Sequence, residues 1–241
     1  MRLAVISDIH ANLEAFHEVL HDLDGQKTDD IVCLGDNVGY GPEPQAVLDL
    51  LEQRGISSVT GNHELGLLSW PDLGGFNPYA AQIITKTRDM VEERAMDAIR
   101  DMPLFIIRHG CRFVHGMPPE SYYEYLYLCG NDDLPAVFHR YAERICFVGH
   151  THELRLASFD GETASRRNLE QETVQLRKDM RYIVNAGSVG QPRDGDNRAK
   201  YVIWDSDKDT IEARFIPYDI EKTVRRMEEE GLPKRYADRL W

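Results

Sequence analysis

The chain has 241 residues, of which 42% are hydrophobic and 29% are charged, a balance typical of a soluble globular protein with a substantial core. Its 28 basic and 41 acidic residues give a net charge of -13, which argues against binding to long nucleic acids. Two bound divalent cations would bring that charge only to -9 (-13 + 4).

The chain shows no sign of secretion, membrane insertion or division into parts. Met1 and Arg2 run directly into a short apolar segment, and no stretch approaches the ~18 apolar residues of a membrane span. We therefore expect a cytoplasmic protein, with a single domain over residues 1–241. The widely spaced cysteines form no CxxC pair and are expected to be buried, reduced thiols: Cys33, Cys111, Cys129 and Cys146.

The first sixty residues alternate between short apolar runs and amphipathic segments, which predicts strand and helix in turn. Strands are expected at residues 3–6, 31–34 and 57–60. The first helix follows from apolar residues spaced three or four apart, namely Leu13, Phe16, Leu20 and Leu23. A second helix is expected to begin at Pro44, with an inner face formed by Val47, Leu50 and Leu51.

A longer helical pattern covers residues 78–100, with Pro103 after its end. The remainder is richer in strands, expected at residues 104–107, 111–114, 145–148, 154–158, 182–184, 201–204 and 211–215. Charged helices are expected from about residue 219 to residue 240. Early strand–helix units followed by a run of strands indicate an α/β fold with two packed mixed sheets flanked by helices.

Five of the nine histidines lie at the ends of apolar runs, beside Asp, Asn or Gly: His10, His63, His115, His150 and His152. Ligands of α/β proteins bind at the carboxyl ends of strands, where residues distant in sequence converge. This placement predicts a metal site.

Two aspartates, Asp8 and Asp36, also lie at the ends of predicted strands. Asp8 and His10 lie two apart at a strand end, so that both side chains can point to the same side. Alone, such a pair is more often a turn or a helix cap, and Asn12 can cap the following helix. Asp36 follows Gly35 after the second strand, although Gly-Asp is also an ordinary turn signal.

Asn62 offers a neutral amide oxygen after the third strand, and Gly61 lets the backbone expose its side chain. Together the polar residues supply two carboxylates, four imidazoles and one amide, with His63 left over. This set suits two divalent ions that share a carboxylate. Mixed nitrogen and oxygen ligands favour Mn, Fe, Zn, Co or Ni over Mg or Ca.

The order and spacing of these motifs resemble the calcineurin-like metallophosphoesterases. The resemblance rests on Asp8 with His10, Gly35 with Asp36, residues 61–64, His115 with Gly116, and residues 149–152. Residues 185–193 are similar to a late loop of the small bacterial and archaeal phosphodiesterase branch.

The resemblance implies a four-layer α/β/β/α sandwich (metallophosphatase-like) with two metal ions, manganese being favoured. One ion would be held by Asp8, His10 and His152, the other by Asn62, His115 and His150, with Asp36 as the bridge. Two such ions about 3.5 to 4 Å apart can hold the attacking hydroxide between them. His63 would bind no metal and would be the catalytic residue that donates a proton or hydrogen bond to the leaving oxygen. General acid catalysis of this kind typically increases the rate by ~10² to 10⁴.

The implied activity is hydrolysis of a small or nucleotide-like phosphodiester. Protein Ser/Thr phosphatases of this superfamily carry Asp-Arg-Gly after the Gly-Asp motif, whereas residues 35–38 continue here as Gly39, Tyr40 and Gly41, without the arginine. Arg193 could replace the missing cation, and Tyr40 could line the pocket. The alternatives are a phosphomonoesterase, a Ser/Thr protein phosphatase, or a non-catalytic protein-binding scaffold of the same fold. Homo-oligomerisation remains open.

Other histidines and tyrosines have simpler interpretations. His17 and His21 are expected on a solvated helix face, and His109 and His139 on the surface. The tyrosine-rich segment 122–127 is either a lid that stacks on a base or aromatic leaving group, or part of the core or a subunit interface.

Overall fold

The computed structural model describes residues 1–69, 78–130 and 132–241. Its first sheet contains β1 (Arg2–Ile6), β2 (Asp30–Cys33), β3 (Ser57–Ser58), β9 (Thr173–Gln175), β11 (Ala199–Asp205) and β12 (Thr210–Ile216). The second contains β4 (Phe105–Arg108), β5 (Cys111–Val114), β6 (Ile145–Val148), β7 (Leu154–Phe159), β8 (Ala164–Asn168) and β10 (Arg181–Ala186). The strand orders are β3-β2-β1-β11-β12-β9 and β4-β5-β6-β10-β7-β8. Both sheets mix parallel and antiparallel pairs, as predicted.

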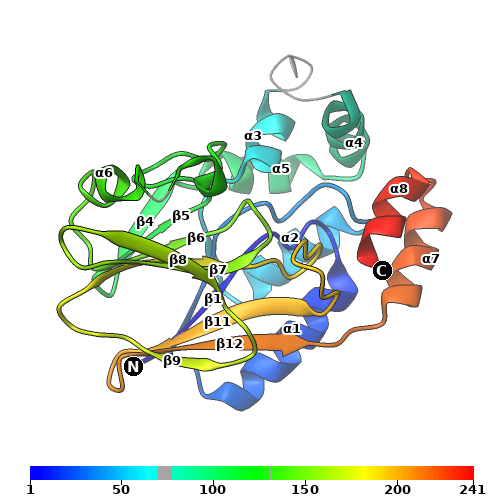
Figure 1. The fold of residues 1–241 in the computed structure, drawn as a ribbon. Coiled ribbons are helices and arrows are strands. Elements are labelled where there is room, and N and C mark those ends of the chain that lie inside the picture. The colour runs from blue at the N-terminus through cyan, green and yellow to red at the C-terminus, as the bar shows by residue number, and fades with distance from the viewer. Residues whose placement is uncertain (70–77, 131) are drawn as a thin grey trace.

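Helices flank the two sheets (Figure 1). They are α1 (Leu13–Gln26), α2 (Pro44–Gln53), α3 (Asn62–Leu68), α4 (Pro78–Asp89), α5 (Glu93–Arg100), α6 (Leu134–Phe138), α7 (Ile220–Glu229) and α8 (Lys234–Ala237). Two 3₁₀ turns, η1 (Leu126–Leu128) and η2 (Asp238–Leu240), complete the described elements. Asn12 caps α1, since its side chain accepts a hydrogen bond from the Ala15 amide at 3.2 Å.

Strand β1 shows how the layers form. Its side chains alternate in direction, so Leu3 and Val5 pack in the core between the two sheets, while Ala4 and Ile6 pack against α1 and α2. On the other side, α6 covers the second sheet through a separate apolar cluster. The layers therefore run helix, sheet, sheet, helix, which confirms the predicted sandwich.

The single helix predicted over residues 78–100 is wrong, because the segment forms α4 and α5 with a break between them. The Met90 amide bonds to the Thr87 carbonyl at 3.0 Å, three residues back, which tightens and ends α4. Glu92 is then extended (φ -70°, ψ 153°), and its amide donates to Gln45 Oε1 of α2 at 2.8 Å. The apolar spacing contains no sign of this contact with a distant side chain.

Strands β8 and β9 were not predicted from the sequence. Both strands are polar, and both lie at the outer edge of their sheets, where the β8 side chains are half-buried or exposed. Strand β3 is shorter than predicted, because the Thr60 amide leaves the sheet and bonds to the Pro103 carbonyl at 2.8 Å. Hydrophobic periodicity does not identify such edges.

Two further expectations can be compared with the structure. The four cysteines are free and buried, as predicted. Among the described residues, none of the helices combines the length and the apolar character needed to cross a membrane.

Candidate metal centre

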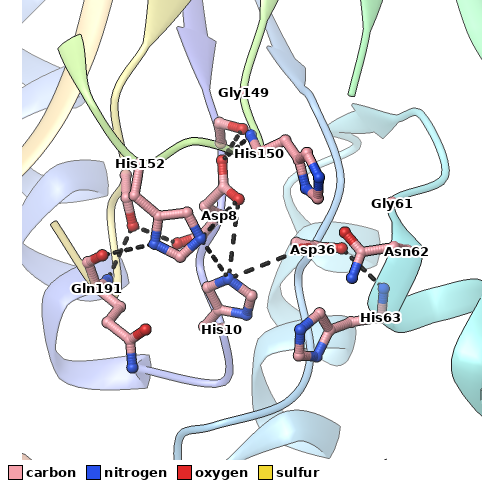
Figure 2. Close-up of polar contacts among 12 residues, drawn as sticks. Asp8, His10, Asp36, Gly61, Asn62, His63, Gly149, His150, His152 and Gln191 are labelled. Carbon is pink, nitrogen blue, oxygen red and sulfur yellow. Dashed lines mark hydrogen bonds and ion pairs between the residues drawn. The ribbon is translucent and has the colours of Figure 1, made fainter. Parts of the chain in front are cut away.

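The seven predicted ligands converge where four strands end. Figure 2 shows six of them, all but His115. Asp8 and His10 follow β1 and Asp36 follows β2, its parallel neighbour. In the second sheet, His115 follows β5, and His150 and His152 follow the parallel strand β6. Asn62 begins α3 and is half-buried, while the other six residues are buried.

A first cluster consists of Asp8, His10 and His152. Asp8 Oδ1 lies 3.2 Å from His152 Nε2 and 3.7 Å from His10 Nε2. The two Nε2 atoms are 3.1 Å apart. All three donor atoms lie within 4.8 Å of one another, so the cluster can hold a metal ion.

A second cluster consists of Asp36, His115 and His150, with Asn62 beside it. His115 Nε2 lies 3.3 Å from Asp36 Oδ2 and 3.1 Å from His150 Nδ1. Asn62 Oδ1 is 3.3 Å from the same nitrogen of His115. The donor atoms of the first three residues again lie within 4.8 Å of one another.

Asp36 connects the two clusters. Its Oδ2 lies 3.3 Å from His115 Nε2 in one cluster and 3.8 Å from His10 Nε2 in the other. Its Oδ1 is turned away and accepts a hydrogen bond from the His63 amide at 2.9 Å. One carboxylate oxygen therefore faces both candidate metal positions.

Hydrogen bonds behind the imidazoles orient them toward the centre. Three rings have Nδ1 beside a backbone carbonyl, which leaves Nε2 for a cation: His10 with Val38 (3.0 Å), His115 with Leu34 (2.8 Å) and His152 with Gln191 (2.6 Å). His150 is reversed, because its Nε2 faces the Tyr123 carbonyl at 3.1 Å and its Nδ1 faces the centre. Each ring thus offers one inward nitrogen.

Asp8 provides an independent indication of a cation. Its Oδ2 accepts hydrogen bonds from Ser7 Oγ (2.5 Å) and the His150 amide (3.0 Å). Its Oδ1 is buried and has no hydrogen-bond partner among the described residues. Burial opposes ionisation, but the neighbouring His152 imidazole keeps the pKa of Asp8 below its usual range. A buried, unpartnered carboxylate oxygen beside imidazole nitrogens fits a divalent cation.

The backbone of the ligand loops adopts conformations that are rare for residues other than glycine. Five of the seven predicted ligands have positive φ angles: Asp8 (52°), His10 (48°), Asp36 (51°), His150 (67°) and His152 (59°). Such left-handed residues are unfavourable and cluster at functional sites, where the surrounding structure enforces them. The backbone therefore turns repeatedly at this edge to aim its donors inward.

His63 lies beside the centre. Its ring centroid is 4.8 Å from that of His10, and its donor atoms lie within 4.8 Å of those of His10 and Asp36. Burial lowers its pKa, so the imidazole is neutral near pH 7. Gly39 leaves room for this ring, because a Cβ at that position would overlap it.

Glu64 supports the centre, a role that its place in the motif of residues 61–64 did not predict. Its carboxylate accepts hydrogen bonds from the amides of Asp36 (2.9 Å), Asn37 (2.7 Å) and Gly61 (2.9 Å). Burial and the charge of Asp36 raise its pKa to about 7. The available signal was its place three residues after Gly61, as in a capping box.

The late loop of residues 185–193 supports the site from the second sheet. Asn185 Nδ2 donates to the Gly149 carbonyl at 2.9 Å, and Ser188 Oγ donates to the Asp8 carbonyl at 2.8 Å. This loop therefore bonds to the loops that carry both clusters. The motif of this loop was visible in the sequence, but the supporting roles of these two residues were not predicted.

Tyr40 and Arg193 lie at the edge of the centre. The half-buried Tyr40 ring is 4.6 Å from both the His10 and the His63 rings. Arg193 is exposed, and its Cζ is 6.0 Å from the Tyr40 ring centroid. It donates to Gln191 Oε1 at 3.0 Å. Both residues are therefore within reach of a molecule bound at the clusters.

The tyrosine-rich segment covers His150. Tyr125 stacks on the His150 ring with centroids 3.9 Å apart and planes 19° apart. Tyr123 and Tyr127 are 58% and 46% exposed, and Tyr122 and Tyr125 are half-buried, so core packing of these side chains is wrong. The lid and the subunit interface stay predictions.

Residues away from the centre behave as expected. His17, His21, His109 and His139 are exposed. A cavity of about 520 Å³ lies between α2, α5 and β4, and none of the predicted site residues lines it. Its arginines already have carboxylate partners, since Arg94 pairs with Asp49 at 2.7 Å and Arg108 with Asp30 at 3.2 Å. Size alone therefore does not mark the functional site.

Comparisons with known proteins agree with this geometry. Residues 1–209 match the model of the calcineurin-like phosphoesterase superfamily domain. The chain is 38% identical to the uncharacterized protein MJ0912 of Methanocaldococcus jannaschii, over 99% of this chain and 97% of the relative. A metallophosphoesterase structure from Sphaerobacter thermophilus superimposes with a TM-score of 0.84 and 34% identity, covering 100% and 98% of the two chains. A shorter similarity, 38% over 78 residues, covers 32% of this chain and 36% of serine/threonine-protein phosphatase 2 of Escherichia coli.

Proposed function

This chain belongs to the calcineurin-like phosphoesterase superfamily, and from that membership we propose that it is a two-metal phosphodiesterase acting on a small or nucleotide-like phosphodiester. The observation that carries the proposal is the position of Asp36 Oδ2, which faces His10 in one cluster and His115 in the other. A carboxylate shared by two imidazole clusters suits a pair of cations better than a single cation.

We assign the first ion to Asp8, His10 and His152, and the second to Asn62, His115 and His150, with Asp36 as the bridge. The mixed nitrogen and oxygen donors favour manganese, with Fe, Zn, Ni or Co as substitutes. Bound cations of this kind supply Lewis acidity, which neutralises phosphoryl oxygens and lowers the pKa of water.

His63 is the proposed catalytic residue of the chain. Its imidazole is buried beside the clusters, and its Nδ1 has no hydrogen-bond partner among the described residues. Because burial keeps the ring neutral, it retains one N–H that it can donate to the leaving oxygen. Gly39 leaves the space in which the ring adopts this position.

Arg193 and Tyr40 are the proposed substrate contacts. Arg193 has no carboxylate partner among the described residues, so its guanidinium can donate to a phosphoryl oxygen. A diester carries one negative charge at its phosphate, fewer than a monoester, and it needs fewer cations from the protein. The absence of arginine after Asp36 therefore favours a diester.

The second candidate is a phosphomonoesterase of the protein phosphatase type. The 78-residue similarity to a serine/threonine-protein phosphatase favours it. A non-catalytic scaffold has less support, because it has no physical need for seven converging donors with a buried His63 beside them.

The test compares hydrolysis of bis-p-nitrophenyl phosphate with that of p-nitrophenyl phosphate, using metal-stripped protein with and without added Mn²⁺. We expect metal-dependent diesterase activity, and a loss of ~10² to 10⁴ in rate for His63→Ala with Mn²⁺ binding retained. His17→Ala, on an exposed helix face, is the matched control. Preference for the monoester would assign a phosphatase, and inactivity with every divalent metal would favour the scaffold.

A further inference from the structure

A separate cavity of about 170 Å³ adjoins the candidate metal centre. It is lined by Tyr40, Tyr79, Ala80, Arg235, Tyr236 and Arg239. Tyr40 belongs to both places, because its ring is 4.6 Å from the His10 and His63 rings and 5.1 Å from the Tyr236 ring. The Tyr40 ring therefore borders both this cavity and the candidate metal centre. Figure 1 shows α8, which carries Arg235 and Tyr236, beside the end of the chain.

The two arginines of the cavity have no carboxylate partner among the described residues. Arg235 donates to Gln82 Oε1 at 2.9 Å, and its Cζ lies 3.8 Å from the Tyr79 ring centroid. Its Nε is buried and has no hydrogen-bond partner among the described residues. Arg239 is exposed, lies 5.9 Å from the Tyr236 ring centroid, and forms neither a hydrogen bond nor an ion pair within the described ranges. The adjacent Asp238 is engaged with Lys234 at 2.5 Å.

Acidic partners are abundant in this chain, which has a net charge of -13. Arginines elsewhere in the described chain commonly find one, such as Arg214 with Asp22 at 2.6 Å or Arg112 with Glu143 at 3.0 Å. Arg193, whose Cζ is 6.0 Å from the Tyr40 ring centroid, also has no carboxylate partner among the described residues. Tyr40 thus lines a cavity with two such arginines and lies near a third. Guanidinium groups are suited to binding phosphate oxygens in pairs.

We propose that the cavity lined by Arg235 and Arg239 binds a second phosphate group of the substrate, while the first phosphate is held at the metal clusters. This inference rests on the proposed function, because it takes the scissile phosphate to lie at those clusters. It narrows the substrate class to phosphoesters that carry at least two phosphates, as in a nucleoside oligophosphate. Tyr40 lies between the two phosphate positions and lines both.

The test measures calorimetric binding of two nucleotides to the Mn²⁺-loaded protein, at one free Mn²⁺ concentration. The probes are adenosine 5′-monophosphate and α,β-methylene adenosine 5′-diphosphate, whose bridging carbon resists hydrolysis. We expect the diphosphate analogue to bind more tightly. We expect Arg239→Gln to weaken its binding about tenfold, as for one charged hydrogen bond, with the monophosphate unaffected. Arg239→Lys retains the charge and should recover part of the loss.

Arg225→Gln is the matched control, because it removes the same charge from an exposed position on α7 outside the cavity. Equal binding of the two nucleotides by the unmodified protein would overturn the proposal, as would equal losses in Arg239→Gln and Arg225→Gln. Hydrolysis of bis-p-nitrophenyl phosphate, which has no second phosphate, should be unchanged in Arg239→Gln. A protein that fails to hydrolyse this diester but discriminates between the nucleotides would contradict the proposed function and support the second-phosphate site.

Discussion

The carboxylate of Glu64 holds the backbone of Asp36, since its Oε2 accepts a hydrogen bond from the Asp36 amide at 2.9 Å. The same oxygen also accepts from the Gly61 amide at 2.9 Å. A buried side chain without a metal role thus joins the loop of the bridging carboxylate to the start of α3. The contribution of Glu64 to metal binding can therefore be measured separately from that of the ligands themselves.

Glu64→Gln should weaken metal binding, because the amide NH₂ of Gln cannot accept the backbone hydrogen bonds that a carboxylate oxygen accepts. Loss of a hydrogen bond that orients a ligand typically costs 10- to 100-fold in affinity, and we expect a loss of about that size. Titration with Mn²⁺ measures it, and circular dichroism checks the fold. Activity should return at high Mn²⁺; failure to recover activity despite full metal loading would show that Glu64 acts in the chemistry.

Gly39→Ala should displace the His63 ring, because the new Cβ would overlap it. We expect kcat to fall by about 100-fold, as for a displaced catalytic group, with Mn²⁺ affinity nearly unchanged. Gly55→Ala is the matched control: Gly55 has a similar positive φ of 63°, but no atom lies within 4 Å of its added Cβ. An equal loss of activity in the two variants would mean that backbone strain, and not His63, is responsible.

Tyr125→Ala should weaken metal binding at the second cluster, because its ring stacks on His150 at 3.9 Å. Aromatic pairs contribute about 0.5 to 1.5 kcal/mol, so we expect a loss of up to about tenfold in Mn²⁺ affinity, and little loss for Tyr125→Phe. Tyr123→Ala is the control, since Tyr123 reaches His150 only through its carbonyl. Unchanged affinity in Tyr125→Ala would leave the segment with a role in substrate or subunit contacts alone.

Metal binding should release protons near pH 7. Burial opposes protonation of His115, but Asp36 raises the pKa of this imidazole to about 9, so His115 is protonated at neutral pH in the metal-free protein. A cation must displace that proton, and its apparent affinity should therefore rise with pH up to about 9. Calorimetry in buffers of different ionisation enthalpy should detect about one proton released at pH 7. Proton release that is absent at pH 7 would show that His115 is already neutral.

The convergence of the candidate ligands was predictable because it follows from strand direction. His115 and His150 each follow a buried run, and parallel neighbours such as β5 and β6 bring their carboxyl ends to one edge. The four layers were expected from the resemblance of the motif series, and the structure shows how β1 contributes to them, since alternation sends Val5 to one core and Ile6 to the other.

The features that escaped prediction depend on contacts between distant residues. The break before α5 involves Gln45 of another helix, and Glu64 bonds to amides 27 and 28 residues earlier in the chain. A polar residue in a helix is usually solvated, so its type alone does not show that it is buried against a loop. The exposed strand β8 lacks the apolar face on which strand prediction depends.

Metal binding should stabilise the folded protein, because five candidate ligands are held in left-handed backbone conformations that only the folded chain maintains: Asp8, His10, Asp36, His150 and His152. An unfolded chain does not hold these residues in such conformations, so the donors are dispersed once the sheets separate. A cation that binds only the folded form stabilises it by mass action, by about 2.7 kcal/mol when its free concentration is 100 times its dissociation constant. The melting temperature of the protein should then depend on the concentration of divalent metal around it.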